Sequence, residues 1–390
     1  MLARAAVWAT ARATAAWAAA TATAAVAAAV AAVAATAAAA AVAVAAAVAG
    51  AGAAAAAAAG LAVRDKVEDV RLEGACALAL AGEAAGGTLF AATRHGEGGG
   101  GLAAVSTKRG GLEVLGAVSD PRMRGAAAVA TNPGGTLAYV AAGGADSLTV
   151  VDVSSAKNPQ VLGSVNHAVD LKGACSVATD GETMVYVAAC SSGKVSAVDV
   201  STPAAPEITA ALQLSAAQSV HYAEGRLLVA SGHARRVTSL TAKGKGLSKL
   251  FSLKDEMLDH AVAVQVGLTE DKLVAAAGAY GGSVSFLNVT DTGILMDHTM
   301  KAAGRAGLSE ISGVVDIVGR KGDGVLYAAA TRPLDGVGTL SKINSADHKL
   351  DEVLGSVSDT RLDGMTSIAV AADGVVYAAV PGHSRIVSAS

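Results

Sequence analysis

Charged side chains recur at equivalent places in a short repeated segment, and two groups of them could bind a ligand. The first group is basic and comes from the first, second and last copies of the segment: Arg71, Arg122, Arg124 and Arg361. Because guanidinium groups in neighbouring repeats attract negative charge, this group predicts a surface for an anionic ligand or another protein. Glu73 and Asp363 stand in the same copies and would neutralise part of the charge.

The second group combines oxygen and nitrogen ligands in the fifth and sixth copies: Asp259, His260 and Glu310. Carboxylates and imidazole suit calcium or another divalent metal. His260 also replaces a residue that is small in the other copies. A lone histidine is more often structural, so we expect no cofactor and keep a divalent metal as the alternative.

The repeated segment, here called the cassette, indicates the fold through its spacing. It contains a usually polar residue, an apolar one, another polar one and then a pair that is usually small. Its seven copies begin at Arg71, Arg122, Asp170, Gln213, Met257, Glu310 and Arg361, at intervals of 43 to 53 residues. A period of this length that contains several short strands is typical of a β-propeller blade.

The third repeat shows the strands of one blade most clearly. It reads GACSVATDG, TMVYVAACSSG, KVSAVDVSTPAAP and EITAALQL, and turn-forming residues separate the four apolar segments. Aromatic residues recur at nearly one offset of the second strand: Phe90, Tyr139, Tyr186, Tyr327 and Tyr377. We interpret them as core residues that fill the space between blades, with a ligand-stacking ladder as the weaker alternative.

The last repeat lacks a fourth strand, whereas the segment from Lys66 to Leu72 resembles one and has no repeat of its own. Pairing this segment with Arg385 to Ser388 would leave no open sheet edge. The sequence therefore predicts an all-β protein: a seven-bladed β-propeller of four-stranded blades over residues 65–390. An N-terminal strand completes its last blade and closes the ring.

Residues 1–64 form an Ala-rich low-complexity leader, with no charged residue between Arg12 and Arg64. Ala buries too little area to offset the entropy of ordering such a segment as a packed domain. Three interpretations stay open: a signal or transit peptide, a membrane anchor, or a disordered tail. The protein is thus expected to be secreted, membrane-anchored or organelle-targeted, and to meet a membrane only through this leader.

The charge balance argues against a nucleic-acid partner, and the cysteines argue against a disulfide framework or a cysteine metal site. The chain has 30 basic and 33 acidic residues, so it offers no basic surface for nucleic acid. Cys76, Cys175 and Cys190 do not form a disulfide framework or a C-x-x-C metal site. Cys175 and Cys190 fall on successive strands of one hairpin and could approach each other, but we favour unpaired thiols.

The segments GACSVATDG, MVYVA and VSAVDVSTPAAP, all from the third repeat, resemble the LVIVD repeat, a bacterial and algal β-propeller repeat. The resemblance extends from about Arg71 to the C-terminus and is best in repeats two and three. It implies a propeller that is usually found on secreted or surface proteins, and it carries over no catalytic residues.

No nucleophile elbow, phosphate loop or zinc-protease helix is present in the sequence. The inner strands are mainly Ala, Val, Ser and Gly, which are poor in catalytic groups. We therefore expect a non-catalytic binding or scaffold protein whose outer-to-inner strand loops contact a protein or an anionic ligand. The alternative is a metal-dependent propeller hydrolase or lactonase.

Overall fold

The computed structural model describes one unit of the chain, which lies within residues 52–390. The described residues are 61–81, 87–95, 99–108, 111–242, 244–266, 274–279, 282–301, 311–319, 325–332, 336–344 and 353–390. Most of the Ala-rich leader and Glu310 lie outside these residues.

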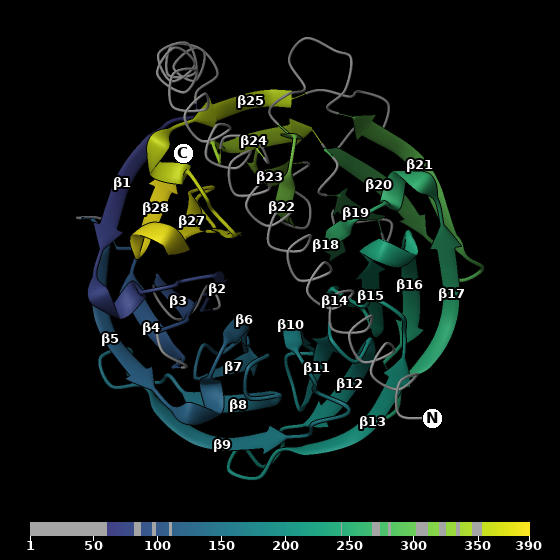
Figure 1. Cartoon of the computed structure of the whole chain (residues 1–390), viewed down its shortest axis with the longest axis horizontal. Helices are drawn as coiled ribbons and strands as arrows, with labels where there is room; N and C mark the ends of the chain where they lie inside the picture. Colours follow the sequence, from purple (N-terminus) through teal and green to yellow (C-terminus); the bar gives the residue numbers. More distant parts are fainter. Residues whose placement is uncertain are drawn as a thin grey trace, which may run out of the picture. The chain divides into compact units, whose positions relative to one another are not determined.

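The described strands form seven four-stranded antiparallel sheets around a ring (Figure 1). Blade 1 consists of β2 (Ala77–Leu80), β3 (Thr88–Thr93), β4 (Gly101–Ser106) and β5 (Glu113–Ser119). Blade 2 consists of β6 (Ala126–Thr131), β7 (Leu137–Ala142), β8 (Ser147–Asp152) and β9 (Gln160–Asn166). Blade 3 consists of β10 (Ala174–Thr179), β11 (Met184–Ala189), β12 (Lys194–Asp199) and β13 (Glu207–Gln213). In each blade the first strand is the innermost.

The remaining blades repeat this order. Blade 4 consists of β14 (Ser219–Ala223), β15 (Arg226–Ser231), β16 (Arg236–Thr241) and β17 (Ser248–Lys254). Blade 5 consists of β18 (Ala261–Val266), β19 (Val274–Ala279), β20 (Ser283–Val289) and β21 (Ile294–Lys301). Blade 6 consists of β22 (Val314–Gly319), β23 (Val325–Thr331), β24 (Gly338–Asn344) and β25 (Val353–Ser358). Blade 7 consists of β26 (Ser367–Val370), β27 (Val376–Val380), β28 (Arg385–Ala389) and β1 (Val63–Glu68).

The predicted closure of the ring is confirmed. β1 pairs antiparallel with β28, with Lys66 opposite Val387, and Ala62 and Ser390 exchange two backbone hydrogen bonds. The strand begins earlier than residue 65, and Leu61 is buried against blades 6 and 7. The last part of the expected strand instead forms the 3-10 turn η1 (Val70–Leu72).

The core lies between neighbouring blades, as the aromatic pattern predicted. Tyr139 of blade 2 packs with Val185 and Val187 of blade 3, and only 1% of Tyr139 is exposed. The alanines around it let the two sheets approach closely. Tyr186 continues this packing into blade 4, where its ring stacks on Tyr222 with centroids 5.6 Å apart.

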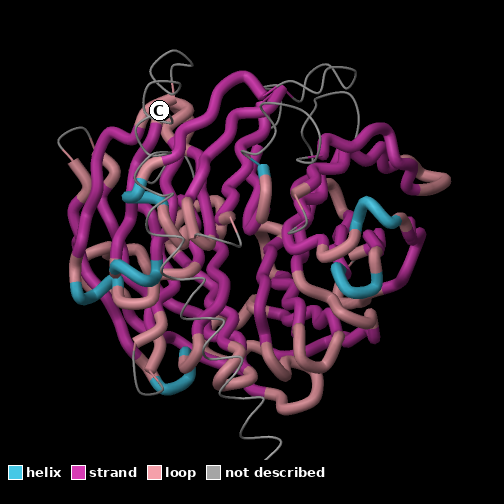
Figure 2. Tube along the Cα trace, turned by 45° about the horizontal axis from the view of Figure 1, so that its top comes forward, coloured by secondary structure: helices cyan, strands magenta, loops and turns pink. Residues whose placement is uncertain are grey.

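Among the described residues, four cassettes have a complete 3-10 turn between the outer strand of one blade and the inner strand of the next. These turns are η1, η3 (Pro121–Met123), η5 (Glu256–Leu258) and η7 (Thr360–Leu362). The apolar residue of each turn is fully buried: Leu72, Met123, Leu258 and Leu362. Figure 2 shows that helix occurs only as such short turns among the described strands. In this part of the chain no helix is long and apolar enough to cross a membrane.

The small position of the cassette has a left-handed backbone in all seven copies. Its φ angles lie between +56° and +77° at Gly74, Gly125, Gly173, Ala216, His260, Gly313 and Gly364. Glycine adopts this conformation without steric cost, whereas other residues are strained there. The recurring small residue is thus explained by the backbone, and His260 departs from it at a cost in conformational energy.

The expectation of unpaired thiols on blade 3 is wrong, because Cys175 and Cys190 form a disulfide. The pairing of β10 with β11 shifts between Ala174 and Ser176, so Cys175 lies in an irregularity of the sheet. The Cα atoms of the two cysteines are then 5.9 Å apart, within the range that a disulfide spans. Cys76 is a free thiol.

Candidate binding face on the cassette turns

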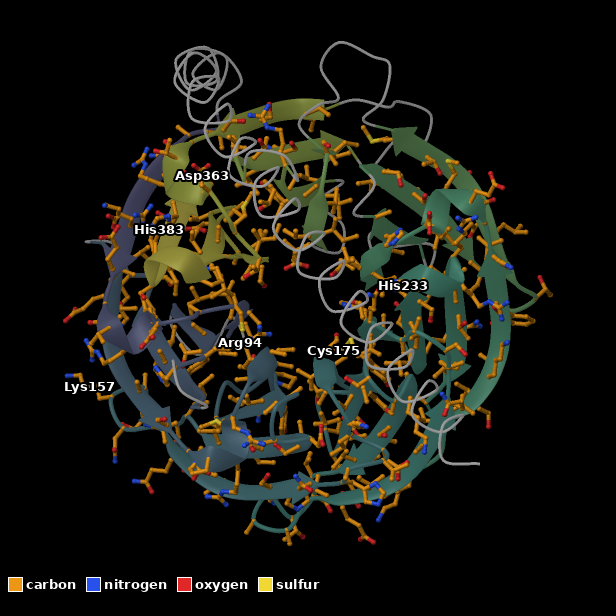
Figure 3. All side chains as sticks on the ribbon, viewed as in Figure 1. Arg94, Lys157, Cys175, His233, Asp363 and His383 are labelled. Carbon is orange, nitrogen blue, oxygen red and sulfur yellow. A yellow bond between two sulfur atoms is a disulfide. The ribbon has the colours of Figure 1, made fainter. Side chains whose placement is uncertain are left out.

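The cassette turns share one face of the ring with the connections between the second and third strands of each blade. This face is called the cassette face below. In Figure 3, Arg94 and Cys175 lie toward the centre of the ring, whereas Lys157 is at its outer rim. Lys157 belongs to a connection between the third and fourth strands, which lies on the opposite face.

The structure places Arg361, Arg71 and Arg122 on three successive connections, which join blade 6 to 7, blade 7 to 1 and blade 1 to 2. Each arginine pairs with the aspartate two residues before it. The guanidinium of Arg71 donates from Nε to Oδ1 of Asp69 at 2.9 Å and from Nη2 to Oδ2 at 2.7 Å. Arg122 makes these two bonds with Asp120, and Arg361 makes them with Asp359. Three of the four expected basic residues are thus held in ion pairs.

These ion pairs shift the pKa values of both partners. Hydrogen bonding from Arg122 lowers the pKa of the Asp120 carboxyl, and the same contact raises the pKa of Arg122. The side chains of Arg122 and Asp120 are 48% and 19% exposed, so solvent screens the pair. The cassette face therefore presents paired charges at these positions rather than a row of free cations.

Arg124 is arranged differently. Its Nε donates to the carbonyl oxygen of Gly144 at 2.9 Å, and Nη2 reaches the same oxygen. No described carboxylate forms a salt bridge with it, so its charge is the least compensated of the four. The contact ties the cassette between blades 1 and 2 to the adjoining connection in blade 2.

The expected metal ligands are brought together only in part. Nε of Arg235 lies 3.1 Å from Oδ1 of Asp259, and Nδ1 of His260 lies 3.2 Å from the same oxygen. Nη2 of Arg235 donates to Oδ2 at 3.3 Å, so both carboxylate oxygens are engaged. No group of three or more metal-ligating side chains occurs among the described residues. Because Glu310 lies outside them, the metal site stays a prediction.

The central channel contains two titratable groups that sequence reasoning missed. It has a volume of about 280 Å³ and is lined by the innermost strands. The carboxylate of Asp316 accepts backbone hydrogen bonds from Ile317 and, across the blade boundary, from Ile368, both at 2.9 Å. Burial raises the pKa of Asp316 to about 6 and lowers the pKa of His221 to about 4. Each occurs once in the repeat pattern, so no periodic signal marked it.

No protein-family model and no curated protein matches the chain. Solved structures do share its fold. The WD40 repeats of RRP9 align with a TM-score of 0.63 and 12% identity, over 84% of this chain and 99% of that one. A protein from Lactobacillus plantarum aligns with a TM-score of 0.58 and 17% identity, over 73% and 85% of the two chains.

A structure of the mitotic checkpoint complex aligns with a TM-score of 0.58 and 14% identity, over 84% of this chain and 93% of that one. At such low identity the likeness concerns the fold alone. Together with the seven sheets and the closing strand, it establishes that this chain is a seven-bladed β-propeller.

Proposed function

We propose that this protein is a non-catalytic propeller that binds a protein or an anionic ligand on the cassette face. The observation that carries the proposal is the construction of the turns. Each capped 3-10 turn anchors one buried apolar residue, such as Met123, while the flanking Arg122 and Arg124 stay exposed. A rigid backbone with varied exposed side chains is typical of a recognition surface.

Two further proposals concern family and compartment. The LVIVD-type repeat is supported by repeat three, where the quoted segments overlap the observed strands β10, β11 and β12. Delivery to an oxidising compartment is supported by the disulfide of Cys175 and Cys190. Sequencing the N-terminus of the mature protein from its native cells tests one route to such a compartment, since loss of the leader would support a cleaved targeting peptide and an intact leader would contradict one.

The binding proposal is tested by charge reversal. We expect Arg122→Glu with Arg124→Glu to weaken capture of native partners in a salt-dependent way while changing the melting temperature little. Lys157→Glu is the matched control, because Lys157 is exposed on the connection from β8 to β9, on the opposite face of the same blade. Equal capture by the two variants would contradict the proposal.

A further inference from the structure

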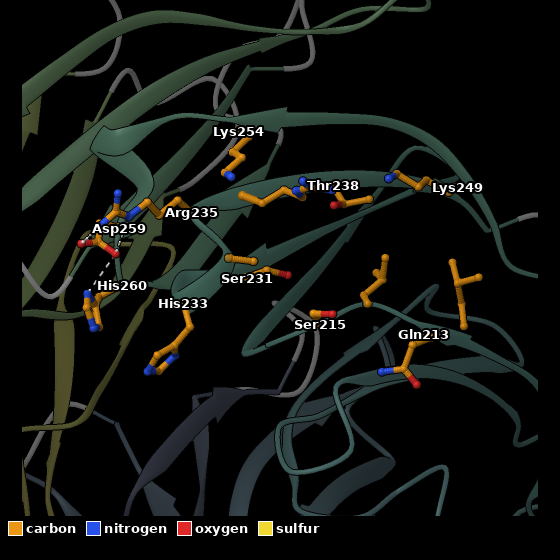
Figure 4. A pocket seen from close by; sticks show the side chains of 14 residues that line it. Gln213, Ser215, Ser231, His233, Arg235, Thr238, Lys249, Lys254, Asp259 and His260 are labelled. Atoms are coloured by element: carbon orange, nitrogen blue, oxygen red, sulfur yellow. Dashed lines mark hydrogen bonds and ion pairs between the residues drawn. The ribbon is translucent and has the colours of Figure 1, made fainter.

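A groove of about 770 Å³ lies between blades 3 and 4 and opens on the cassette face (Figure 4). One wall is the end of β13 with the segment that follows it, including Leu212, Leu214 and Ser215. The other wall is formed by β16 and β17 of blade 4. Asp259 and His260 border one end, and Lys249 lies at the other (Figure 4).

The groove contains polar atoms without partners, although neighbouring blades satisfy the equivalent atoms. In blades 2 and 3, the third residue of the third strand donates to the carbonyl of the first cassette residue. Thr149 bonds in this way to Arg122 at 3.3 Å, and Ser196 bonds to Asp170 at 2.9 Å. Thr238 has the same position in blade 4 and is fully buried, yet its hydroxyl has no partner.

The first residue of the third strand shows the same contrast. Lys194 of blade 3 donates to Asp170 at 2.6 Å, and Arg385 of blade 7 donates to Glu68 at 2.7 Å. In blade 4 this residue is Arg236, and its Nε is buried without a partner. A buried donor that loses its hydrogen bond to water carries a desolvation penalty. A ligand that accepts these hydrogen bonds would remove that penalty.

The sequence explains why this junction is open. Asp120, Asp255 and Asp359 each follow the outer strand of a blade and begin a 3-10 turn. The residue that follows the outer strand of blade 3 is Leu214, whose backbone N–H donates to Gly193 as that of Asp120 does to Gly100. Leu214 has no carboxylate to cap a turn, and the described connection from β13 to β14 contains no 3-10 turn.

The groove is also positively charged. Four basic residues line it, and its single carboxylate, Asp259, is already held by Arg235. Arg236 and Lys254 are directly opposite each other on β16 and β17. Like charges in this arrangement repel and destabilise a sheet unless an anion lies between them. No described residue forms an ion pair with Arg236, Lys249 or Lys254.

We infer that this groove binds an extended acidic segment of a polypeptide, whose carboxylates accept hydrogen bonds from Arg236, Thr238 and Lys254. Lys249 and Lys254 are five residues apart on one strand, about 16 Å at the usual rise, which matches an extended segment of similar length. Cations spread over this distance fit several carboxylates better than one compact anion. The inference deepens the proposed function, because it gives the cassette face a defined site for an anionic partner.

The test measures binding of fluorescein-labelled hexaglutamate to the full chain by fluorescence anisotropy, with hexaglutamine as the control peptide. We expect hexaglutamate alone to bind, with an affinity that falls as salt rises. Arg236→Gln and Lys254→Gln should each weaken binding about tenfold or more, as expected for the loss of a hydrogen bond between charged groups. Thr238→Val should weaken it severalfold.

Thermal melts separate binding from folding, because removing either of two repelling charges should leave the melting temperature unchanged or higher. Lys157→Gln is the matched charge control and should bind like the native chain. Unchanged binding in Arg236→Gln and Lys254→Gln would overturn the inference. The inference would also be overturned if inorganic phosphate bound as tightly as hexaglutamate and lost affinity in the same variants. The site would then be one for a compact anion.

The proposed function is judged separately. If hexaglutamate binding is lost on charge reversal at Arg122 and Arg124 but not at Arg236 and Lys254, the cassette face binds anions and the groove assignment fails. If the groove variants alone lose binding, the groove assignment stands, and partner capture by the Arg122 and Arg124 variants decides whether the wider surface contributes.

Discussion

The carboxylate of Asp120 holds both the backbone and the side chain of Arg122. Its Oδ1 accepts the backbone N–H of Arg122 at 2.8 Å and Nε at 2.9 Å, while Oδ2 accepts Nη2 at 2.8 Å. One carboxylate thus caps the turn and neutralises the guanidinium. Asp69 and Asp359 make the same bonds, so this capping arrangement recurs in the propeller.

The two roles of Asp120 can be separated by mutation. Asp120→Ala removes the cap and should lower the free energy of unfolding by about 1 kcal/mol. Arg122→Ala removes only an exposed ion pair and should cost less than about 0.5 kcal/mol. Urea unfolding measures both, and equal losses would show that the ion pair, rather than the cap, stabilises the turn.

Because the backbone of His260 is left-handed, we expect its replacement by glycine to stabilise the protein. His260→Gly should raise the free energy of unfolding by about 1 kcal/mol, because glycine adopts φ +56° without strain. Gly364→Ala, with open space around an added Cβ, should cost a similar amount. Gly74→Ala should cost clearly more, since its Cβ would lie 2.3 Å from the carbonyl oxygen of Arg94. Equal losses at the two glycines would contradict this explanation.

Asp316 predicts a pH dependence of stability. Its pKa rises from 3.8 to about 6 on folding, so the stability that its protonated form contributes is present below pH 3.8 and is lost as the pH rises to about 6. Relative to the native chain, Asp316→Asn should therefore gain stability between pH 4 and pH 7, by up to about 3 kcal/mol. His221 titrates in both proteins and cancels in this difference. A pH-independent difference in urea unfolding would exclude the shift.

Because β1 closes the ring, we expect truncation of the chain before or after β1 to have very different effects on stability. A chain that begins at Leu61 keeps β1 and should melt cooperatively, like the full chain. A chain that begins at Asp69 lacks β1, exposes the edge of β28, and should melt at much lower temperature or aggregate. Similar melting of the two chains would show that β1 contributes little to closing the ring.

The disulfide predicts the thiol content and a change in stability. Unreduced protein unfolded in guanidinium should show one reactive thiol, that of Cys76, and three after reduction. Replacing Cys175 and Cys190 together by Ser should lower the free energy of unfolding by about 3 kcal/mol, the value expected for a loop of this length. Three thiols before reduction would contradict the bridge.

The sequence predicted the features that repeat and missed those that depend on one position. Tyr139 and Tyr186 mark a periodic core, and the unassigned segment at Lys66 indicated the closing strand. Asp69 was overlooked because the cassette was defined from Arg71, so the charge of that arginine was taken as free. The groove at Arg236 lies where Leu214 stands in place of a capping aspartate, and the missing turn leaves no motif to find.

The closure of the ring also fixes where its ends lie. Val63 pairs with Ala389, whereas Glu68 pairs with Arg385, next to the turns of the cassette face. The first and last residues of the propeller therefore leave from neighbouring points on the opposite face. A tether joined to either end would therefore begin on the side away from the cassette face and the groove. Joining the two ends through a short linker would allow the ring to be opened instead at any hairpin on that same side.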